Sequence, residues 1–266
     1  MQDGVWPALA AVRVRLGLVA LLLATAAACW WLTFDQMQQM DGGPWTALGT
    51  LPWFVGVWIV MMAAMMFPSV APTVALYSRM TRTRWTIAPL AFAAGYLLIW
   101  ASVGVLTFAI AAGLGEAFGN VLAWDRAGRW VAAATLTGAA AYELTPLKDV
   151  CLGKCRSPLG FLLTAWRDGP TGGLKMGARH GAWCFACCWA LMASLFALGV
   201  MSLAWMAFIA ALIAAEKLIP SRRVATVGTA AILLTLGLLL LLSPEAIPGL
   251  TLPHGGQMSP MGEMTP

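Results

Sequence analysis

The chain has 266 residues, of which 61% are hydrophobic and only 10% are charged, and its mean hydropathy is +0.80. A soluble domain normally carries about a quarter charged residues, so this composition excludes an ordinary soluble protein and indicates an integral membrane protein. The net charge of +5 requires no nucleic-acid partner, because basic residues accumulate on the cytoplasmic side of membrane proteins.

Long, continuously apolar stretches rich in Ala, Leu and Gly predict transmembrane helices rather than barrel strands, in which apolar and polar residues would alternate. We predict an all-α, polytopic helical membrane bundle of about seven helices. They cover residues 14–34, 53–77, 86–112, 129–147, 180–200, 203–219 and 224–243. Residues 1–243 would form a single transmembrane domain. Residues 244–266 would form a disordered extracytoplasmic tail, because they are rich in Met, Pro and Gly and poor in apolar residues.

The basic residues predict the orientation of these spans. With a cytoplasmic N-terminus, fourteen of the sixteen Lys and Arg residues fall on the cytoplasmic side, and only Arg126 and Arg129 fall outside. We therefore expect a multi-pass membrane protein with a cytoplasmic N-terminus.

The second predicted span contains four methionines, Met61, Met62, Met65 and Met66. Their i, i+4 spacing places the four thioethers on one broad helix face. Pro68 and Pro72 follow and leave the carbonyls of Ala64 and Pro68 without their helical donors. Such breaks are tolerated only where protein or a cavity covers them, so we expect this span inside the bundle. Thioethers select Cu(I), although methionine also fills gaps in apolar packing.

Further methionines lie in the polar segments expected outside the membrane. Met37 and Met40 form an M-x2-M pair in the first outer loop, and the tail carries H-x3-M-x2-M-x2-M from His254 to Met264. Polar, disordered segments have no core for these side chains to fill. Thioethers also remain available in an oxidising compartment where thiols would be lost. The pattern indicates Cu(I) binding, with a chance Met-rich tail as the alternative.

Five of the six cysteines fall within 38 residues. They are Cys151, Cys155, Cys184, Cys187 and Cys188. Cys151 and Cys155 lie in the predicted cytoplasmic loop 148–179, which also contains a Gly-Pro-Thr-Gly-Gly turn. The last three form one helical stripe with His180 at i, i+4, i+7 and i+8. Because the fourth span runs inward and the fifth runs outward, we expect all five thiols at one depth near the cytoplasmic boundary.

A soft metal ion is the simplest reason for this concentration of thiols. Thiolates and thioethers select Cu(I), while Cys and His in tetrahedral geometry also suit Zn(II). We expect nearby cations to lower the thiol pKa values and favour the thiolate ligand. These cations are Lys148, Lys154, Arg156 and Arg179. Two alternatives are that the cysteines pack as small apolar residues, or that they exchange disulfides, which the reducing cytosol disfavours.

Glu143 lies near the inner end of the fourth span, where an ionisable residue is a functional candidate. It can neutralise Lys148 or accompany a metal ion. Glu216 and Lys217 close the sixth span. No Ser-His-Asp arrangement, Walker loop or dinucleotide glycine motif is present, so we expect no catalytic residue and no organic cofactor.

Several motifs resemble a bacterial family of predicted metal-binding integral membrane proteins of unknown function. The resemblance covers roughly residues 50–220. It rests on Met61-Met62-Ala63-Ala64-Met65-Met66 with Pro68, on Tyr142 to Lys148 followed by Cys151 and Cys155, and on Cys184 with Cys187-Cys188-Trp189. The resemblance implies a helical, multi-pass protein of the bacterial inner (cytoplasmic) membrane and a bound metal ion.

We therefore expect a protein that binds Cu(I), with Zn(II) as the second choice, for copper uptake, transfer or delivery. The expected ligands are Cys151, Cys155, Cys184, Cys187, Cys188 and His180, with Met61, Met62, Met65 and Met66 as a second site. The expected partners are the metal ion, membrane lipid and a metallochaperone or metalloenzyme, but no nucleic acid. The alternatives are a membrane thiol-disulfide protein and an assembly partner of a metalloenzyme.

Overall fold

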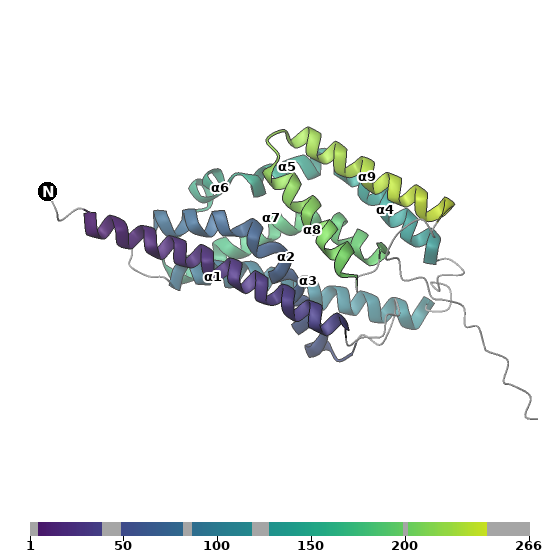
Figure 1. Ribbon diagram of the computed structural model, residues 1–266, viewed down its shortest axis with the longest axis horizontal. Coiled ribbons are helices and arrows are strands. Elements are labelled where there is room, and N and C mark those ends of the chain that lie inside the picture. The colour runs from purple at the N-terminus through teal and green to yellow at the C-terminus, as the bar shows by residue number, and fades with distance from the viewer. Residues whose placement is uncertain (1–4, 39–48, 82–86, 119–127, 199–201, 244–266) are drawn as a thin grey trace, which may run out of the picture.

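The computed structural model describes residues 5–38, 49–81, 87–118, 128–198 and 202–243 (Figure 1). Within these ranges the chain forms nine helices and no strand, which confirms the predicted all-α class. The helices are α1 (Val5–Gln38), α2 (Leu51–Met80), α3 (Ile87–Phe118), α4 (Arg129–Glu143), α5 (Pro146–Arg156), α6 (Pro158–Ala165), α7 (Gly169–Leu198), α8 (Leu203–Leu218) and α9 (Arg222–Leu242).

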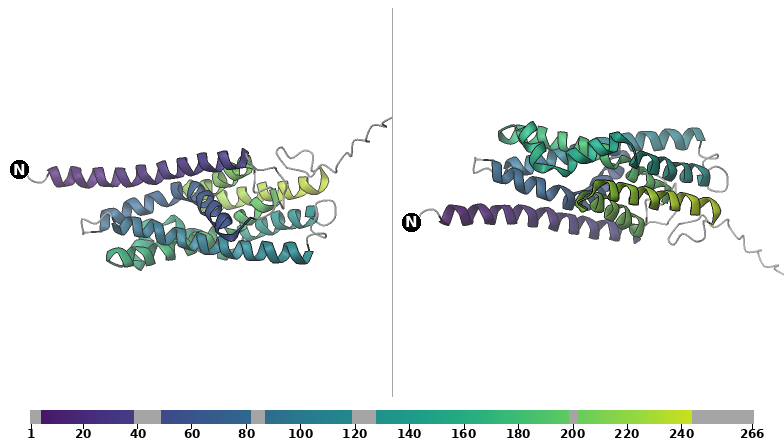
Figure 2. Two further views of the ribbon diagram at one scale, coloured as in Figure 1. Left: turned by 90° about the horizontal axis from the view of Figure 1, so that it is seen from below. Right: turned by 90° about the horizontal axis from the view of Figure 1, so that it is seen from above.

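Five of these helices are long and apolar enough to cross a membrane. They are α1 over Leu16–Gln36, α2, α3 over Ile87–Gly113, α7 and α9, and in Figure 2 the long helices run along the same axis of the molecule. Helices α4 and α8 occupy the other two predicted spans but have only 15 and 16 residues. At 1.5 Å per residue they measure about 23 Å, less than the ~30 Å hydrocarbon core of a bilayer. Both pack against α7 and α9 within the bundle.

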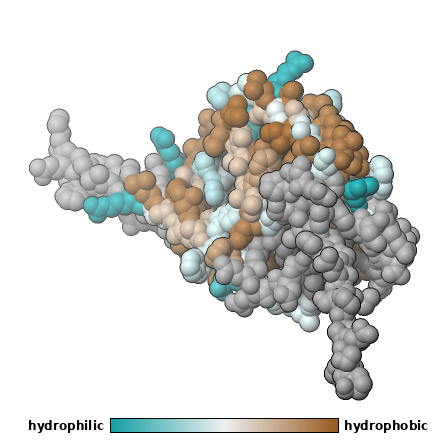
Figure 3. Space-filling model, turned by 45° about the vertical axis from the view of Figure 1, so that its right-hand side comes forward, coloured by the Kyte–Doolittle hydropathy of each residue, from teal (hydrophilic) through white to brown (hydrophobic). Residues whose placement is uncertain are grey.

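Large apolar side chains are exposed along these helices, for example Leu106 on α3 and Leu238 on α9. Figure 3 shows brown, hydrophobic residues over much of the described surface on one face. Soluble monomers rarely expose wide apolar surfaces. The exposed side chains therefore suit contact with lipid.

The predicted cytoplasmic loop is largely helical, because prolines begin helices there. Thr145 precedes Pro146 and has an extended backbone, as the residue before proline prefers. Helix α4 therefore ends at Glu143, earlier than predicted, and α5 begins at Pro146. The predicted turn at residues 169–173 is wrong: Gly169, with φ of +78°, begins α7, and Pro170 follows in its first turn, where proline is favoured.

The proline-containing helix α2 lies inside the bundle, as the sequence predicted. It contacts α1, α3, α6 and α8, and all four methionines of its central segment are buried. The carbonyl of Ala64, which Pro68 deprives of its helical donor, accepts a hydrogen bond from the Trp30 indole N–H at 3.1 Å. The indole of α1 thus satisfies a backbone group that would otherwise be unpaired in an apolar environment.

Helices α3 and α7 approach closely along a row of glycines, Gly173, Gly177 and Gly181. A Cβ added to Gly177 would lie 1.9 Å from the backbone oxygen of Phe92, and one added to Gly173 would lie 2.5 Å from that of Ala88. Small residues four apart allow helix backbones to meet in this way. The close approach sets the position of Tyr96 on α3 relative to the cysteines one turn beyond Gly181.

Candidate metal centre

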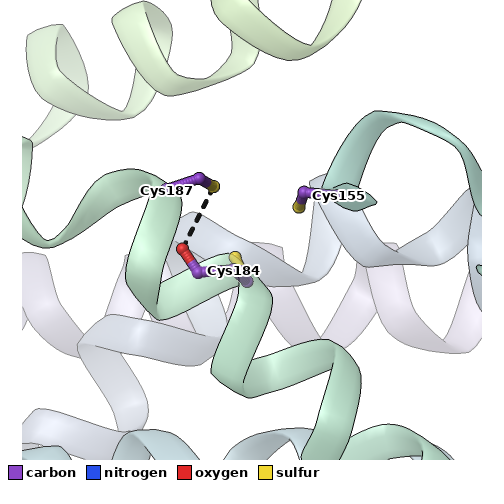
Figure 4. Close-up of side chains that lie close together, drawn as sticks. All are labelled: Cys155, Cys184 and Cys187. Atoms are coloured by element: carbon purple, nitrogen blue, oxygen red, sulfur yellow. Dashed lines mark hydrogen bonds between the residues drawn. The ribbon is translucent and has the colours of Figure 1, made fainter. Parts of the chain in front are cut away.

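Three of the predicted cysteine ligands converge in the structure. Cys184 and Cys187 lie on α7, and Cys155 faces them from α5 (Figure 4). Their Sγ atoms all lie within 4.8 Å of one another. All three side chains are buried, and all six cysteines are free thiols. We call Cys155, Cys184 and Cys187 the thiol group.

Helix α5 is held in place by contacts with the turn between α8 and α9. The Arg156 guanidinium donates to the backbone carbonyls of Ile219 and Pro220. Arg222 donates to the Asp149 carbonyl at 3.3 Å and pairs with its carboxylate at 3.3 Å. These contacts at both ends of α5 orient the helix so that Cys155 meets α7.

The remaining predicted ligands lie outside this group of three. The Cys188 thiol donates to the Cys184 carbonyl at 2.9 Å, and Cys151 is buried one turn before Cys155. The His180 ring packs among Phe92, Tyr96 and Phe161. Its Nδ1 is buried with no hydrogen-bond partner among the described residues.

Two polar groups that the sequence analysis did not assign to the site contact Cys184. The Tyr96 hydroxyl lies 3.0 Å from its Sγ, and the Lys217 ammonium donates to the same sulfur at 3.4 Å. Lys217 also donates to the Ser69 hydroxyl at 2.9 Å and so bridges α8, α7 and α2. Nothing in a single sequence indicates that Tyr96 or Lys217 reaches this sulfur, because each lies on a different helix from Cys184.

The cations of the predicted cytoplasmic loop do not activate its two thiols, contrary to expectation. Burial raises the pKa of the Cys151 thiol, and the opposing effect of Lys148 is smaller. Hydrogen bonding to Cys184 and Cys187, followed by burial, raises the pKa of the Cys155 thiol well above its usual range. Both changes stabilise the protonated thiol.

Lys148 is engaged by two carboxylates. Its ammonium lies 2.8 Å from an oxygen of Glu143 and 2.8 Å from an oxygen of Glu216, and all three side chains are buried. The predicted pairing of Glu143 with Lys148 is confirmed, and Glu216 is a second partner. This charged triad joins α4, α5 and α8 next to the thiol group.

The four methionines of α2 form the second candidate region, which we call the thioether face: Met61, Met62, Met65 and Met66. All four side chains are buried in the apolar core. Ser69 links this face to the thiol group. Its hydroxyl donates to the Met66 carbonyl at 2.8 Å and accepts from Lys217, which also contacts Cys184. Met40 and the tail methionines lie outside the described residues.

Chemically, the thiol group offers three soft donors within reach of one ion, in a buried place. Thiolates of this kind favour Cu(I). Structural Zn(II) sites normally have four protein ligands, whereas this group contains three among the described residues. The donor set therefore suits a soft metal ion such as copper.

Comparison with known proteins agrees with this chemistry. No curated protein and no solved structure matches the chain. The PpoB2 family model, described as a copper chaperone, matches residues 55–240. This region is more than half of the chain and includes the thiol group and the thioether face. The match agrees with the expected metal-binding family and copper handling. The chain belongs to the PpoB2 copper chaperone family.

Proposed function

We propose that this protein is a membrane copper chaperone that holds Cu(I) in the thiol group and passes it to a second protein. The observation that carries the proposal is the convergence of three buried, free thiols from two helices within 4.8 Å. A soft monovalent ion held by these sulfurs is shielded from water and oxidants. The ion remains exchangeable, because three sulfurs lie within its reach and one thiolate can be replaced at a time.

The remaining predicted donors have supporting roles in this proposal. Cys151, Cys188 and His180 border the thiol group and would accept the ion during transfer. The thioether face would form a second, weaker site, and the methionines of residues 37–40 and of the tail would collect copper outside. This arrangement requires residues 1–243 to lie in the bacterial inner membrane with a cytoplasmic N-terminus, and the tail 244–266 to be extracytoplasmic. The charge distribution of the sequence supports that orientation.

Elemental analysis of the detergent-purified protein, reduced and anaerobic, tests the proposal. The wild-type protein is expected to hold near-stoichiometric copper after loading. A variant with serine in place of Cys155, Cys184 and Cys187 is expected to hold almost none. Cys29→Ser is the matched control, because Cys29 is also a buried free thiol but lies on α1, away from the group. Zinc retained in place of copper, or copper retained by the triple variant, would contradict the proposal.

The proximity of the three thiols also favours a second candidate, a membrane thiol-disulfide protein. Two sulfurs this close can form a disulfide after a modest movement. Trapping of free thiols during turnover separates the two functions. Cycling of Cys155 with Cys184 or Cys187 between free and bonded states, in a protein that holds no copper, would replace the chaperone proposal with the redox one.

A further inference from the structure

Lys217 is a cation without a carboxylate partner in the part of the chain that the structure describes. Its ammonium is hydrogen-bonded to the Ser69 hydroxyl and the Cys184 sulfur. Lys148, by contrast, has two carboxylates at 2.8 Å. Lys217 is partly buried, and a charge that is partly withdrawn from water is stabilised by an opposite charge beside it. The group positioned to supply that charge at Lys217 is the sulfur of Cys184.

We propose that Lys217 is the positioning residue that balances the charge of the loaded site and makes it a two-thiolate Cu(I) site. This inference rests on the proposed copper function. Two thiolates and one Cu(I) ion together carry a charge of −1. The Lys217 ammonium beside Cys184 reduces the total to zero, so the loaded site adds no net charge to the apolar surroundings.

The charge balance also determines how many sulfurs bind the ion. When Cu(I) enters between the Cys184 thiolate and the Cys187 thiol, two Cu–S bonds form, the Cys187 S–H bond breaks and its proton passes to bulk water, so the total charge of the site with Lys217 stays at zero. With a third thiolate, from Cys155, the ion, the thiolates and Lys217 would together carry a charge of −1. Among the described residues, no other cation contacts the thiol group to offset that charge. Because Cys184 and Cys187 lie on the same helix, we assign the resting pair to them, and Cys155 is the third sulfur, left for exchange with the recipient protein. Its location on the short helix α5, separate from α7, suits that role.

Three variants separate a charge role from a packing role. Lys217→Met keeps the aliphatic stem and removes the charge, while Lys217→Arg keeps the charge and changes the shape. Lys154→Met is the matched control, because Lys154 is next to Cys155 in the chain but exposed. Cu(I) affinity is measured by competition with a chromogenic Cu(I) chelator on the full-length protein in detergent. The sulfur count is measured by X-ray absorption at the copper edge.

Lys217→Met is expected to weaken Cu(I) binding roughly ten- to a hundredfold, the loss expected for a hydrogen bond to a charged group. Lys217→Arg and Lys154→Met are expected to remain within about threefold of wild type, a difference below 1 kcal/mol. The wild-type spectrum is expected to show two Cu–S bonds. If Lys217→Met does not yield a folded protein, Lys217→Gln replaces it, because glutamine keeps a donor without the charge.

The outcomes distinguish this inference from the proposed function. A wild-type protein that binds no Cu(I) overturns the proposed function and this inference with it. A wild-type protein that binds Cu(I) as tightly as Lys217→Met overturns only the role of Lys217. A loss in Lys217→Arg that equals or exceeds the loss in Lys217→Met indicates packing and overturns it too. Three Cu–S bonds in the wild-type protein overturn the two-thiolate site.

Discussion

The thiol group and the thioether face are both buried clusters of soft donors, but they are built differently. The thiol group combines two helices, with Tyr96 and Lys217 reaching Cys184 from two more. The thioether face lies on α2 alone, and its four side chains are surrounded by the apolar core. One region has charged and polar groups directed at a donor atom, whereas the other has the apolar surroundings of ordinary packing.

This difference supports the proposal that the thiol group, rather than the thioether face, holds the ion. Thiolates bring negative charge that must be balanced in an apolar environment, and the thiol group has Lys217 for that purpose. Neutral thioethers require no counter-ion, so a methionine site and a methionine-packed core look alike in structure. Variants that remove a sulfur from each region without changing its volume therefore give the clearest comparison.

The largest effect is expected from Cys184→Ser. Cys184 belongs to the thiol group and is the sulfur that Tyr96 and Lys217 contact, so its loss removes both a ligand and the partner of a cation. We expect the purified variant to lose most of its copper by elemental analysis. Cys188→Ser should keep most of it, because the Cys188 sulfur lies outside the group. Equal losses in the two variants would place the site elsewhere on α7.

The next largest effect is expected from Lys148→Met in the charged triad, which should lower the stability of the protein. Breaking a buried ion pair by removing one partner typically costs roughly 3–5 kcal/mol, because the other charge remains buried. Here two carboxylates would be left, Glu143 and Glu216. The thermal unfolding midpoint in detergent should fall sharply. A triple variant that also carries Glu143→Gln and Glu216→Gln should recover part of the loss, and its failure to do so would show that the triad is held by packing rather than charge.

The sequence pointed to the three cysteines that converge in the structure, together with seven other expected ligands that lie outside this group, but not to the groups that surround them. The cysteine cluster could be recognised because clustered cysteines are unusual in apolar helices and because spacing on one helix is fixed by the helical repeat. Tyr96 and Lys217 could not, since each reaches Cys184 across a helix–helix contact that a single sequence does not specify. The expected lowering of the Cys151 pKa by Lys148 was wrong for a related reason. Lys148 is three residues from Cys151 in the chain, but its ammonium pairs with Glu143 and Glu216.

The fold was predictable to the same extent. Apolar stretches located each long helix, but the helices α5 and α6, which begin at Pro146 and Pro158, fall largely in the segment that was predicted as a loop. The Gly173, Gly177 and Gly181 row was also missed, although its x3 spacing is a recognised sign of close helix packing in membranes. That row aligns α3 with α7 and thereby carries Tyr96 to Cys184.

Gly177→Ala tests this alignment and is expected to have an intermediate effect. Its Cβ would lie 1.9 Å from the Phe92 backbone oxygen, so α3 and α7 must separate. We expect a stability loss of roughly 1–3 kcal/mol, as for other overpacked sites, and weaker copper binding as Tyr96 moves. Gly138→Ala on α4 is the control, because a Cβ there meets nothing within 4 Å and alanine favours the helix. A melting temperature unchanged by Gly177→Ala would show that the contact is less tight than the structure indicates.

The smallest effect on stability is expected at the thioether face, from Met62→Leu combined with Met66→Leu. Leucine nearly conserves the volume of methionine, so each exchange should cost less than about 1.5 kcal/mol. Copper held by the thiol group should be unchanged, because no thiol is lost. If the face conducts Cu(I), transfer of copper into the thiol group of protein in vesicles should slow. Met206→Leu, a buried methionine on α8, is the control. An unaltered transfer rate in the double variant would assign the face on α2 to packing alone and would leave the thiol group, built by α5 and α7, as the copper-binding region.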